Sequence, residues 1–118
     1  MTDDSGFDVD RAFCPDYHRA VELIGRRWTG VILRALLHGA RRFSEMRDVI
    51  PEMTDKMLSA RLRELEAEGI VVRHVTADIP VRVEYALTDK GRDLGETIAA
   101  LSAWADRWAA VEGTQNGP

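Results

Sequence analysis

Apolar residues recur at helical spacing through residues 54–69 and predict a helix with one apolar face. Thr54 suits the N-cap of this helix, because its hydroxyl can accept a hydrogen bond from a free backbone N–H, and Gly69 suits the left-handed residue after its end. A shorter helix and a tight turn precede it, so residues 43–69 predict a helix-turn-helix whose second helix is typical of a DNA reader. Its core-facing residues should be Leu58, Leu62 and Leu65.

Two further helices are predicted before this motif. The first begins at Cys14-Pro15, because proline has no N–H to lose at the first helical position, and it ends at Gly25. The second begins at Trp28 and closes at Gly39. The positions that we expect to face inward are Tyr17, Val21 and Ile24 in the first helix and Trp28, Val31, Ile32, Ala35 and Leu36 in the second.

Alternating apolar residues after the helix-turn-helix predict a hairpin of two strands. Residues 70–76 and 81–88 are rich in valine and flank a turn at residues 77–80. In the second strand, Arg82 and Glu84 should point outward, and Arg82 lies close to the tip. The inward set of that strand is Val81, Val83, Tyr85 and Leu87.

Residues 89–108 are long enough for a helix of about five turns, with an apolar seam of the kind that packs against a partner helix. The seam consists of Leu94, Ile98, Leu101, Ala105 and Trp108.

These elements predict an α+β, mainly helical fold: a winged helix-turn-helix with a two-stranded β wing and additional N- and C-terminal dimerisation helices. With 118 residues the chain holds one domain. We expect this domain to span residues 14–112, with the terminal dimerisation helix at about 89–109, between a flexible acidic arm at residues 1–13 and a flexible tail at residues 113–118.

Charge changes the picture of where DNA would bind. The formal net charge is −4, which by itself argues against nucleic acid. The two ends carry most of the acids, however: residues 1–18 have a net charge of −4 and residues 93–118 of −3, whereas residues 19–92 have +3. Within the second helix of the motif, residues 54–63 hold Lys56, Arg61 and Arg63 against one acid, and the following residues hold only acids. The basic half is the N-terminal half, which contacts base edges in such motifs.

The outward face of this helix suits DNA chemically. Lys56 and Arg63 can reach phosphates or guanine edges, Ser59 can donate or accept a hydrogen bond, and the small Ala60 can touch a thymine methyl group. Arg82 near the wing tip can reach a groove or a phosphate. The alternatives are an ordinary solvated helix face and, at Arg82, an ordinary exposed arginine with or without an acid partner across the hairpin.

The sequence resembles the HxlR-type transcriptional regulators, small dimeric relatives of the MarR winged-helix group. The resemblance rests on four stretches: Cys14-Pro15, IGRRWTGVILRALLHG, RRFSEMRDVIPEMTDKMLSARLRELEAEGIVVR and VRVEYALTDKG. It implies a homodimer built from the terminal helices that binds an inverted-repeat operator and represses or activates a neighbouring gene. It also implies DNA contacts from Thr54, Lys56, Met57, Ser59 and Arg63 on the helix and from Arg82 on the wing.

Cys14, the single cysteine, stands at the start of the first predicted helix, where the helix dipole favours a thiolate. Arg11 and His18 are near in sequence, and Asp16 opposes them. Some members of the resembled family sense electrophiles or oxidants through an N-terminal cysteine at this place, often through a bond between subunits. The other reading is a small residue that seals the helix start against the core.

Other functions have little support in the sequence. The three histidines are scattered, no phosphate loop or nucleophile elbow is present, and we expect no metal, no cofactor and no enzyme activity. No apolar run approaches the ~20 residues that cross a bilayer, and no leader is apparent, so we expect no membrane association and a cytoplasmic protein. A small effector between the helices at the dimer interface, and a winged-helix module that binds protein rather than DNA, remain open. A regulator should bring Arg41, Arg42, Lys56, Arg63 and Arg82 to one surface.

Overall fold

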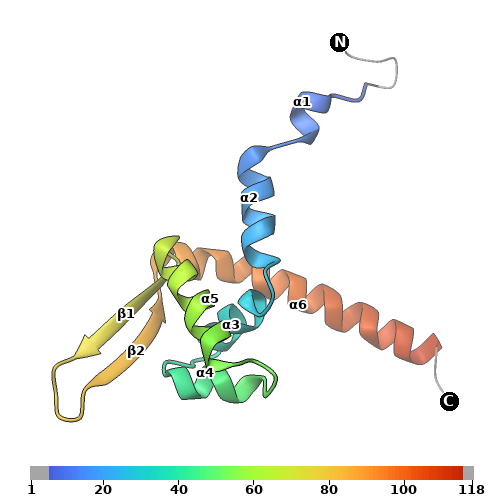
Figure 1. Ribbon diagram of the computed structural model, residues 1–118. Helices are drawn as coiled ribbons and strands as arrows, with labels where there is room; N and C mark the ends of the chain where they lie inside the picture. The colour runs from blue at the N-terminus through green and yellow to red at the C-terminus, as the bar shows by residue number, and fades with distance from the viewer. Residues whose placement is uncertain (1–5, 116–118) are drawn as a thin grey trace.

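The computed structural model describes residues 6–115 and has the predicted order of elements, with one short helix added at the start (Figure 1). The mainly helical fold with a two-stranded antiparallel wing is confirmed. Residues 1–5 of the predicted arm and 116–118 of the predicted tail lie outside the described residues. The elements are α1 (Val9–Ala12), α2 (Pro15–Ile24), α3 (Thr29–Leu37), α4 (Phe43–Val49), α5 (Asp55–Ala67), β1 (Val71–Thr76), β2 (Arg82–Leu87) and α6 (Asp89–Gln115).

The core lies where α3, α4 and α5 meet the base of the wing. The predicted apolar face of α5 is confirmed, because Leu58, Leu62 and Leu65 are at most 1% exposed. The core face of α3 is confirmed at Ile32 and Leu36, and it also includes Leu33, which the predicted set omitted. The other buried apolar residues are Met46, Met53, Ile70, Val71, Leu87 and Ile98.

The prediction that α2 buries an apolar stripe is wrong for two of its three residues. Tyr17 is 70% exposed and Val21 is 44% exposed, and only the end of the helix, at Leu23 and Ile24, packs against the core. The reason is visible in Figure 1, where α1 and α2 stand out from the body as an arm. The spacing of the stripe is helical, but nothing in the described part of the same chain covers it.

The second predicted helix starts one residue late. Trp28 is the N-cap of α3 and adopts a left-handed conformation with φ of 74°, so it lies outside the helix. The turn between α2 and α3 ends here, and the guanidinium carbon of Arg27 lies 4.7 Å from the centre of the Trp28 ring. Thr29, the first residue of α3, is buried.

The wing is a regular hairpin in which Val71 pairs with Leu87 at the base and Thr76 pairs with Arg82 near the tip. Its base is buried and its tip projects into solvent (Figure 1). The prediction that Val81 points inward is wrong: this residue precedes the paired part of β2, beyond the reach of the body, and is 64% exposed.

A joint of short contacts connects α5, the wing and α6. Gly69 ends α5 with a φ of 73°, as predicted, and its carbonyl oxygen accepts a hydrogen bond from the Thr88 hydroxyl at 2.5 Å. The backbone N–H of Thr88 donates to the carbonyl oxygen of Ile70 at 2.9 Å, and Lys90 Nζ donates to that of Glu68 at 2.7 Å. Gly91 lies so close to Ile70 that an added Cβ would overlap the Ile70 carbonyl. The start of α6 is therefore fixed to the end of α5.

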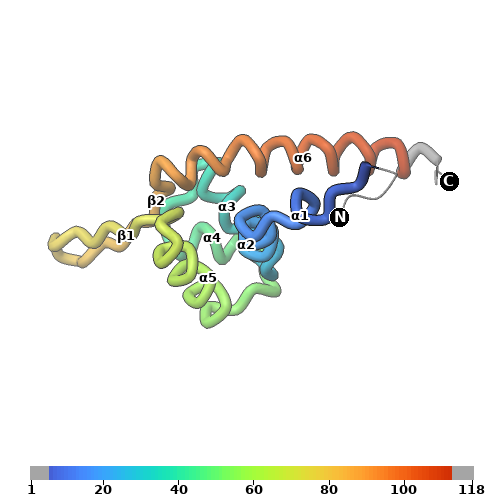
Figure 2. Tube along the Cα trace, turned by 90° about the horizontal axis from the view of Figure 1, so that it is seen from above, coloured from blue at the N-terminus to red at the C-terminus, as the bar shows by residue number. Residues whose placement is uncertain are grey.

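The final helix divides into a packed half and an exposed half. Near its start, α6 packs against α3, and Ile98 is 6% exposed. Further along, Leu101 and Trp104 are more than half exposed and Trp108 is 48% exposed, because the helix runs clear of the body (Figure 2). It continues past the predicted end near residue 109 to Gln115. The predicted seam is therefore covered by the same chain only at its N-terminal end.

Candidate nucleic-acid interface

The first helix of the helix-turn-helix begins with a carboxylate at its third position. Glu45 Oε1 accepts hydrogen bonds from the backbone N–H groups of Arg41 and Arg42, at 3.1 and 2.8 Å. These two bonds, that of Arg41 first, lower the pKa of the Glu45 carboxyl group below its ordinary value. They stabilise the chain where it enters α4.

The second helix begins at a side-chain cap, as predicted. Thr54 Oγ1 accepts a hydrogen bond from the backbone N–H of Met57 at 3.1 Å. Arg47 on α4 forms an ion pair with Asp55 at 3.2 Å, which ties the two helices of the motif together. The N-terminal turn of α5 is thus held in place and also faces solvent.

The predicted DNA contacts on α5 differ in exposure. Thr54, Lys56 and Arg63 are exposed, and Ser59 and Ala60 are half-buried on the flank of the helix. Met57 is half-buried and packs against the core, so only part of its side chain faces outward. The exposed face of α5 therefore carries two cations, a hydroxyl-bearing N-cap and small residues between them.

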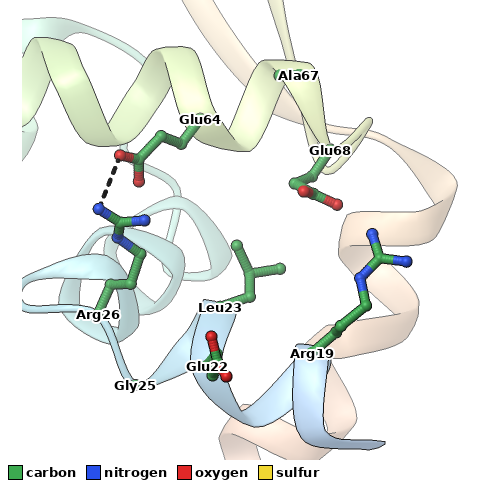
Figure 3. Close-up of a pocket in the computed structure, with 8 residues that line it drawn as sticks. All are labelled: Arg19, Glu22, Leu23, Gly25, Arg26, Glu64, Ala67 and Glu68. Atoms are coloured by element: carbon green, nitrogen blue, oxygen red, sulfur yellow. Dashed lines mark ion pairs between the residues drawn. The ribbon is translucent and has the colours of Figure 1, made fainter. Parts of the chain in front are cut away.

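The predicted basic half of α5 includes Arg61, which stabilises the fold and does not face DNA. The Arg61 side chain is only 14% exposed. Its Nε donates to the carbonyl oxygen of Arg27 at 2.9 Å, and its Nη1 donates to Glu64 at 3.1 Å. Glu64 also pairs with Arg26 at 3.3 Å, as Figure 3 shows. Arg61 thus holds α5 against the turn between α2 and α3 and is not available to DNA.

The wing brings a further arginine beside the helix-turn-helix. Arg82 lines a hollow together with Arg42 from the N-terminus of α4. It lies opposite Thr76 in the hairpin, and among the described residues no acid pairs with it. A cross-strand ion pair is therefore absent among the described residues, and Arg82 is an exposed arginine.

A second basic pair was missed in the sequence. Arg73 on β1 and Arg63 on α5 line the same hollow of about 370 Å³, between the second half of α5 and the wing. Strand alternation could not have found it, because Arg73 lies on the same face as Val71 and Val75, opposite Tyr85 of the predicted inward set. Within the predicted basic surface, Arg42 and Arg82 line one hollow. Arg63 lines a second hollow together with Arg73, which was not predicted.

Cys14 is exposed and lies at the N-cap position of α2, immediately before Pro15. Its neighbour Phe13 lies against the ring of His18, with 5.5 Å between ring centres, and His18 pairs with Glu22. The thiol therefore does not seal α2 against the core of its own chain.

The geometry agrees with what comparison with known proteins finds. Residues 23–113, which make up most of the chain, match the HxlR-like helix-turn-helix family. The chain belongs to the HxlR-like helix-turn-helix family. It is 44% identical over 95 residues to the uncharacterized HTH-type transcriptional regulator YvaP of Bacillus subtilis, covering 80% of this chain and 88% of that protein. It is 43% identical over 100 residues to the HTH-type transcriptional regulator YodB of the same organism, covering 85% and 89%.

Solved structures of transcriptional and redox regulators also resemble the chain over most of its length. The reduced form of YodB from B. subtilis matches with a TM-score of 0.72 and 43% identity, over 80% of this chain and 93% of that chain. The redox regulator HypR in its reduced form matches with a TM-score of 0.77 and 35% identity, over 84% and 98%. The HxlR-like chain is thus a DNA-binding transcriptional regulator with MarR-like neighbours, and the expectation that it is not an enzyme is confirmed by this family membership.

Two other features bear on the HxlR-like chain. Over residues 6–115, no helix combines the length and apolar character that crossing a bilayer requires. In the same residues, no three histidine, cysteine or acidic side chains come together as a metal site would need.

Proposed function

We propose that the protein acts as a homodimer that binds an inverted-repeat operator in the cytoplasm and regulates a neighbouring gene. In each protomer, residues 54–68 lie in the major groove and the wing at 76–82 lies beside it, with the two recognition helices roughly 34–36 Å apart. The proposed DNA contacts are Thr54, Lys56, Met57, Ser59, Ala60 and Arg63 from the helix and Arg82 from the wing.

The observation that carries this proposal is a division among the arginines and lysines. Arg26, Arg47 and Arg61 are engaged in ion pairs or hydrogen bonds that hold the helices together. Lys56 and Arg63, on the exposed face of α5, make no side-chain hydrogen bond or ion pair within the described part of the chain. A free cation retains its donors for phosphate oxygens and base edges.

The dimer is supported by the apolar surface that the single chain leaves uncovered. The arm and the second half of α6 expose large apolar side chains, and isolated soluble proteins rarely leave such patches open. A second copy would cover the arm with the exposed half of α6, in line with the apolar seam of that helix. These residues are Phe7, Val9, Phe13, Tyr17 and Val21 on the arm and Leu101, Trp104, Trp108 and Val111 on α6.

Control by oxidation at Cys14 is the regulation that we favour. The thiol is exposed on the arm that would form the dimer, and one of the neighbouring structures is described as a redox regulator in its oxidized form. Two Cys14 thiols, one from each protomer, would lose two electrons and two protons to a chemical oxidant and form one disulfide. Such a bond would change the relative position of the two arms.

A small effector is the second candidate for the signal. The observation in its favour is a hollow of about 620 Å³ between α2 and the C-terminal half of α5, which has Leu23 at its centre and charged side chains around it (Figure 3). A winged-helix module that binds only protein has less support, because the relatives are transcriptional regulators.

The test is a mobility-shift titration with duplex DNA from beside the gene and, in parallel, with duplexes selected from a random pool. We expect saturable, sequence-specific binding by the reduced protein and altered binding after treatment with diamide. The Cys14→Ser variant should bind the same DNA and ignore diamide. Release of DNA by diamide in this variant would remove Cys14 as the sensor, and failure to select any sequence would contradict the operator proposal.

A further inference from the structure

We propose that the hollow between α5 and β1 is a binding site for one phosphate of the DNA backbone, formed by Arg63 and Arg73 with Ser59 as a third donor. The inference rests on the proposed DNA binding and adds Arg73, which no sequence pattern had placed in the interface. It also assigns Arg63 to the backbone rather than to a base edge. The lining residues of this phosphate hollow are Ser59, Leu62, Arg63, Glu66, Arg73 and Tyr85.

Both arginines are free to bind an anion. Within the described residues, the side chains of Arg63 and Arg73 take part in no hydrogen bond or ion pair, in contrast to Arg61 two positions away. A guanidinium group presents a planar fork of N–H donors that matches the oxygens of a phosphate. Two such groups from different elements can contact one phosphate from two sides, and the Ser59 hydroxyl can donate from the helix.

The position along α5 favours the backbone over the bases. Arg63 follows the first helical residue, Asp55, by eight positions, which is about 12 Å of helix. Base edges are contacted mainly by the first turns of a recognition helix, where Lys56 lies. The hollow lies between the second half of α5 and the wing, where a DNA strand would leave the major groove.

The two walls of the phosphate hollow are held at a fixed separation. Arg73 pairs with Tyr85 across the hairpin. The backbone N–H of Tyr85 donates to the carbonyl oxygen of Arg41 at 2.7 Å, so the wing is attached to the start of α4. Leu62, which lines the hollow, is buried in the core. The backbone segments that carry the two arginines are therefore already in place before a phosphate binds.

Glu66 allows a test in which a substitution should strengthen DNA binding, whereas Arg73→Ala should weaken it. This carboxylate is half-buried in the same hollow, one turn after Arg63, yet no ion pair within 4.0 Å joins it to either arginine in the described structure. It opposes the approach of a phosphate and weakens binding to any duplex. Its removal should therefore strengthen binding without regard to sequence.

The experiment compares the full-length protein with Arg73→Ala and Glu66→Gln on a selected duplex and on an unrelated duplex, over a range of salt concentrations. Arg73→Ala should weaken binding to both duplexes by roughly tenfold and reduce the slope of log K against log salt by about 1.8, because the dimer loses one phosphate contact in each half-site at about 0.9 per contact. Glu66→Gln should strengthen binding to both duplexes about threefold. Arg34→Ala, a change at an exposed arginine of α3, which carries none of the proposed DNA or dimer contacts, is the matched control and should leave the affinity and the slope unchanged.

A methylphosphonate scan of the selected duplex identifies which phosphate group the protein contacts. Neutralising one phosphate in each half-site should weaken the wild-type protein roughly tenfold and should have no further effect on Arg73→Ala. Circular dichroism at the assay temperature and partial rescue by Arg73→Lys distinguish a lost contact from misfolding.

Each contrary result identifies which proposal is wrong. If the wild-type protein selects no duplex, the operator proposal fails. If the wild-type protein binds specifically but Arg73→Ala keeps its affinity and salt slope, only the phosphate site is overturned. A loss confined to the selected duplex would also overturn it, because that pattern indicates a base contact.

Discussion

Arg61 and Arg63 lie two positions apart on α5, yet replacement by alanine should reduce the stability of the fold at one position and the affinity for DNA at the other. Arg61 donates one hydrogen bond to the Arg27 carbonyl at 2.9 Å and one to Glu64 at 3.1 Å, with its side chain 14% exposed. Arg63 is exposed and makes neither kind of bond among the described residues. We expect Arg61→Ala to destabilise the fold and Arg63→Ala to weaken DNA binding alone.

The magnitude for Arg61 can be worked from these contacts. The charged hydrogen bond to the Arg27 carbonyl contributes about 1.5 kcal/mol. The pair with Glu64 adds only about 0.5 kcal/mol, because that carboxylate is partly exposed and keeps Arg26 as a partner. With the packing of the aliphatic stem, the loss comes to about 2 to 3 kcal/mol, or roughly 10 °C in Tm for a domain of this size. The helix propensity change is the same in both variants and cancels.

Urea unfolding followed by circular dichroism measures the difference, at one fixed protomer concentration because a dimer is more stable when concentrated. The midpoint of Arg61→Ala should lie about 1 M below that of the wild-type protein, and that of Arg63→Ala should change by less than about 0.3 M. Titration of the same samples with duplex DNA should show the loss of affinity in Arg63→Ala. Equal midpoints for the two variants would refute the structural assignment of Arg61.

Three further predictions concern stability and assembly. Gly91→Ala should lower Tm more than Gly95→Ala, because the new Cβ meets the Ile70 carbonyl at the first position and only the end of the Leu37 side chain at the second; equal thermal shifts would contradict this packing. The pKa of Glu45 is lowered in the fold by the two backbone hydrogen bonds, so its stabilisation is present at neutral pH and is lost as the pH falls through the lowered pKa. Glu45→Gln should therefore narrow the difference between urea midpoints at pH 7 and pH 3, and an unchanged difference would argue against the hydrogen bonds. Trp104→Glu, at an exposed position of α6, should yield monomers in sedimentation velocity, whereas an intact dimer would move the interface away from α6.

Features that depend on neighbours in sequence were predictable. The cap at Thr54, the first-position proline of α2, the left-handed glycine at the end of α5 and the leucine stripe of α5 each follow from local geometry, and the structure confirms them. Such features need only helical periodicity and the backbone preferences of a few residues.

Features that depend on distant partners were not predictable. Nothing in the spacing of α5 separates Arg61 from Arg63, because the carbonyl group that engages Arg61 lies 34 positions earlier in the chain. The stripe on α2 is amphipathic as expected, but periodicity does not tell which surface covers it, and the described chain leaves Tyr17 exposed. The same holds for Arg73, since alternation places it on the face of Val71 and Val75, and only the fold brings it beside Arg63.

The contacts between Gly69, Thr88 and Gly91 couple the orientation of the DNA-binding domain to that of α6. Because the end of α5, the base of the wing and the start of α6 meet there through short contacts, the winged helix-turn-helix and α6 rotate as one body. The helix α6 is 27 residues long, about 40 Å, so a tilt of about 5° displaces one end relative to the other by roughly 3 Å. Two recognition helices that must enter adjacent major grooves of one duplex no longer fit both grooves at displacements of this size. In the proposed dimer, a modest change in the contact between the two α6 helices should therefore release DNA without any rearrangement inside either DNA-binding domain.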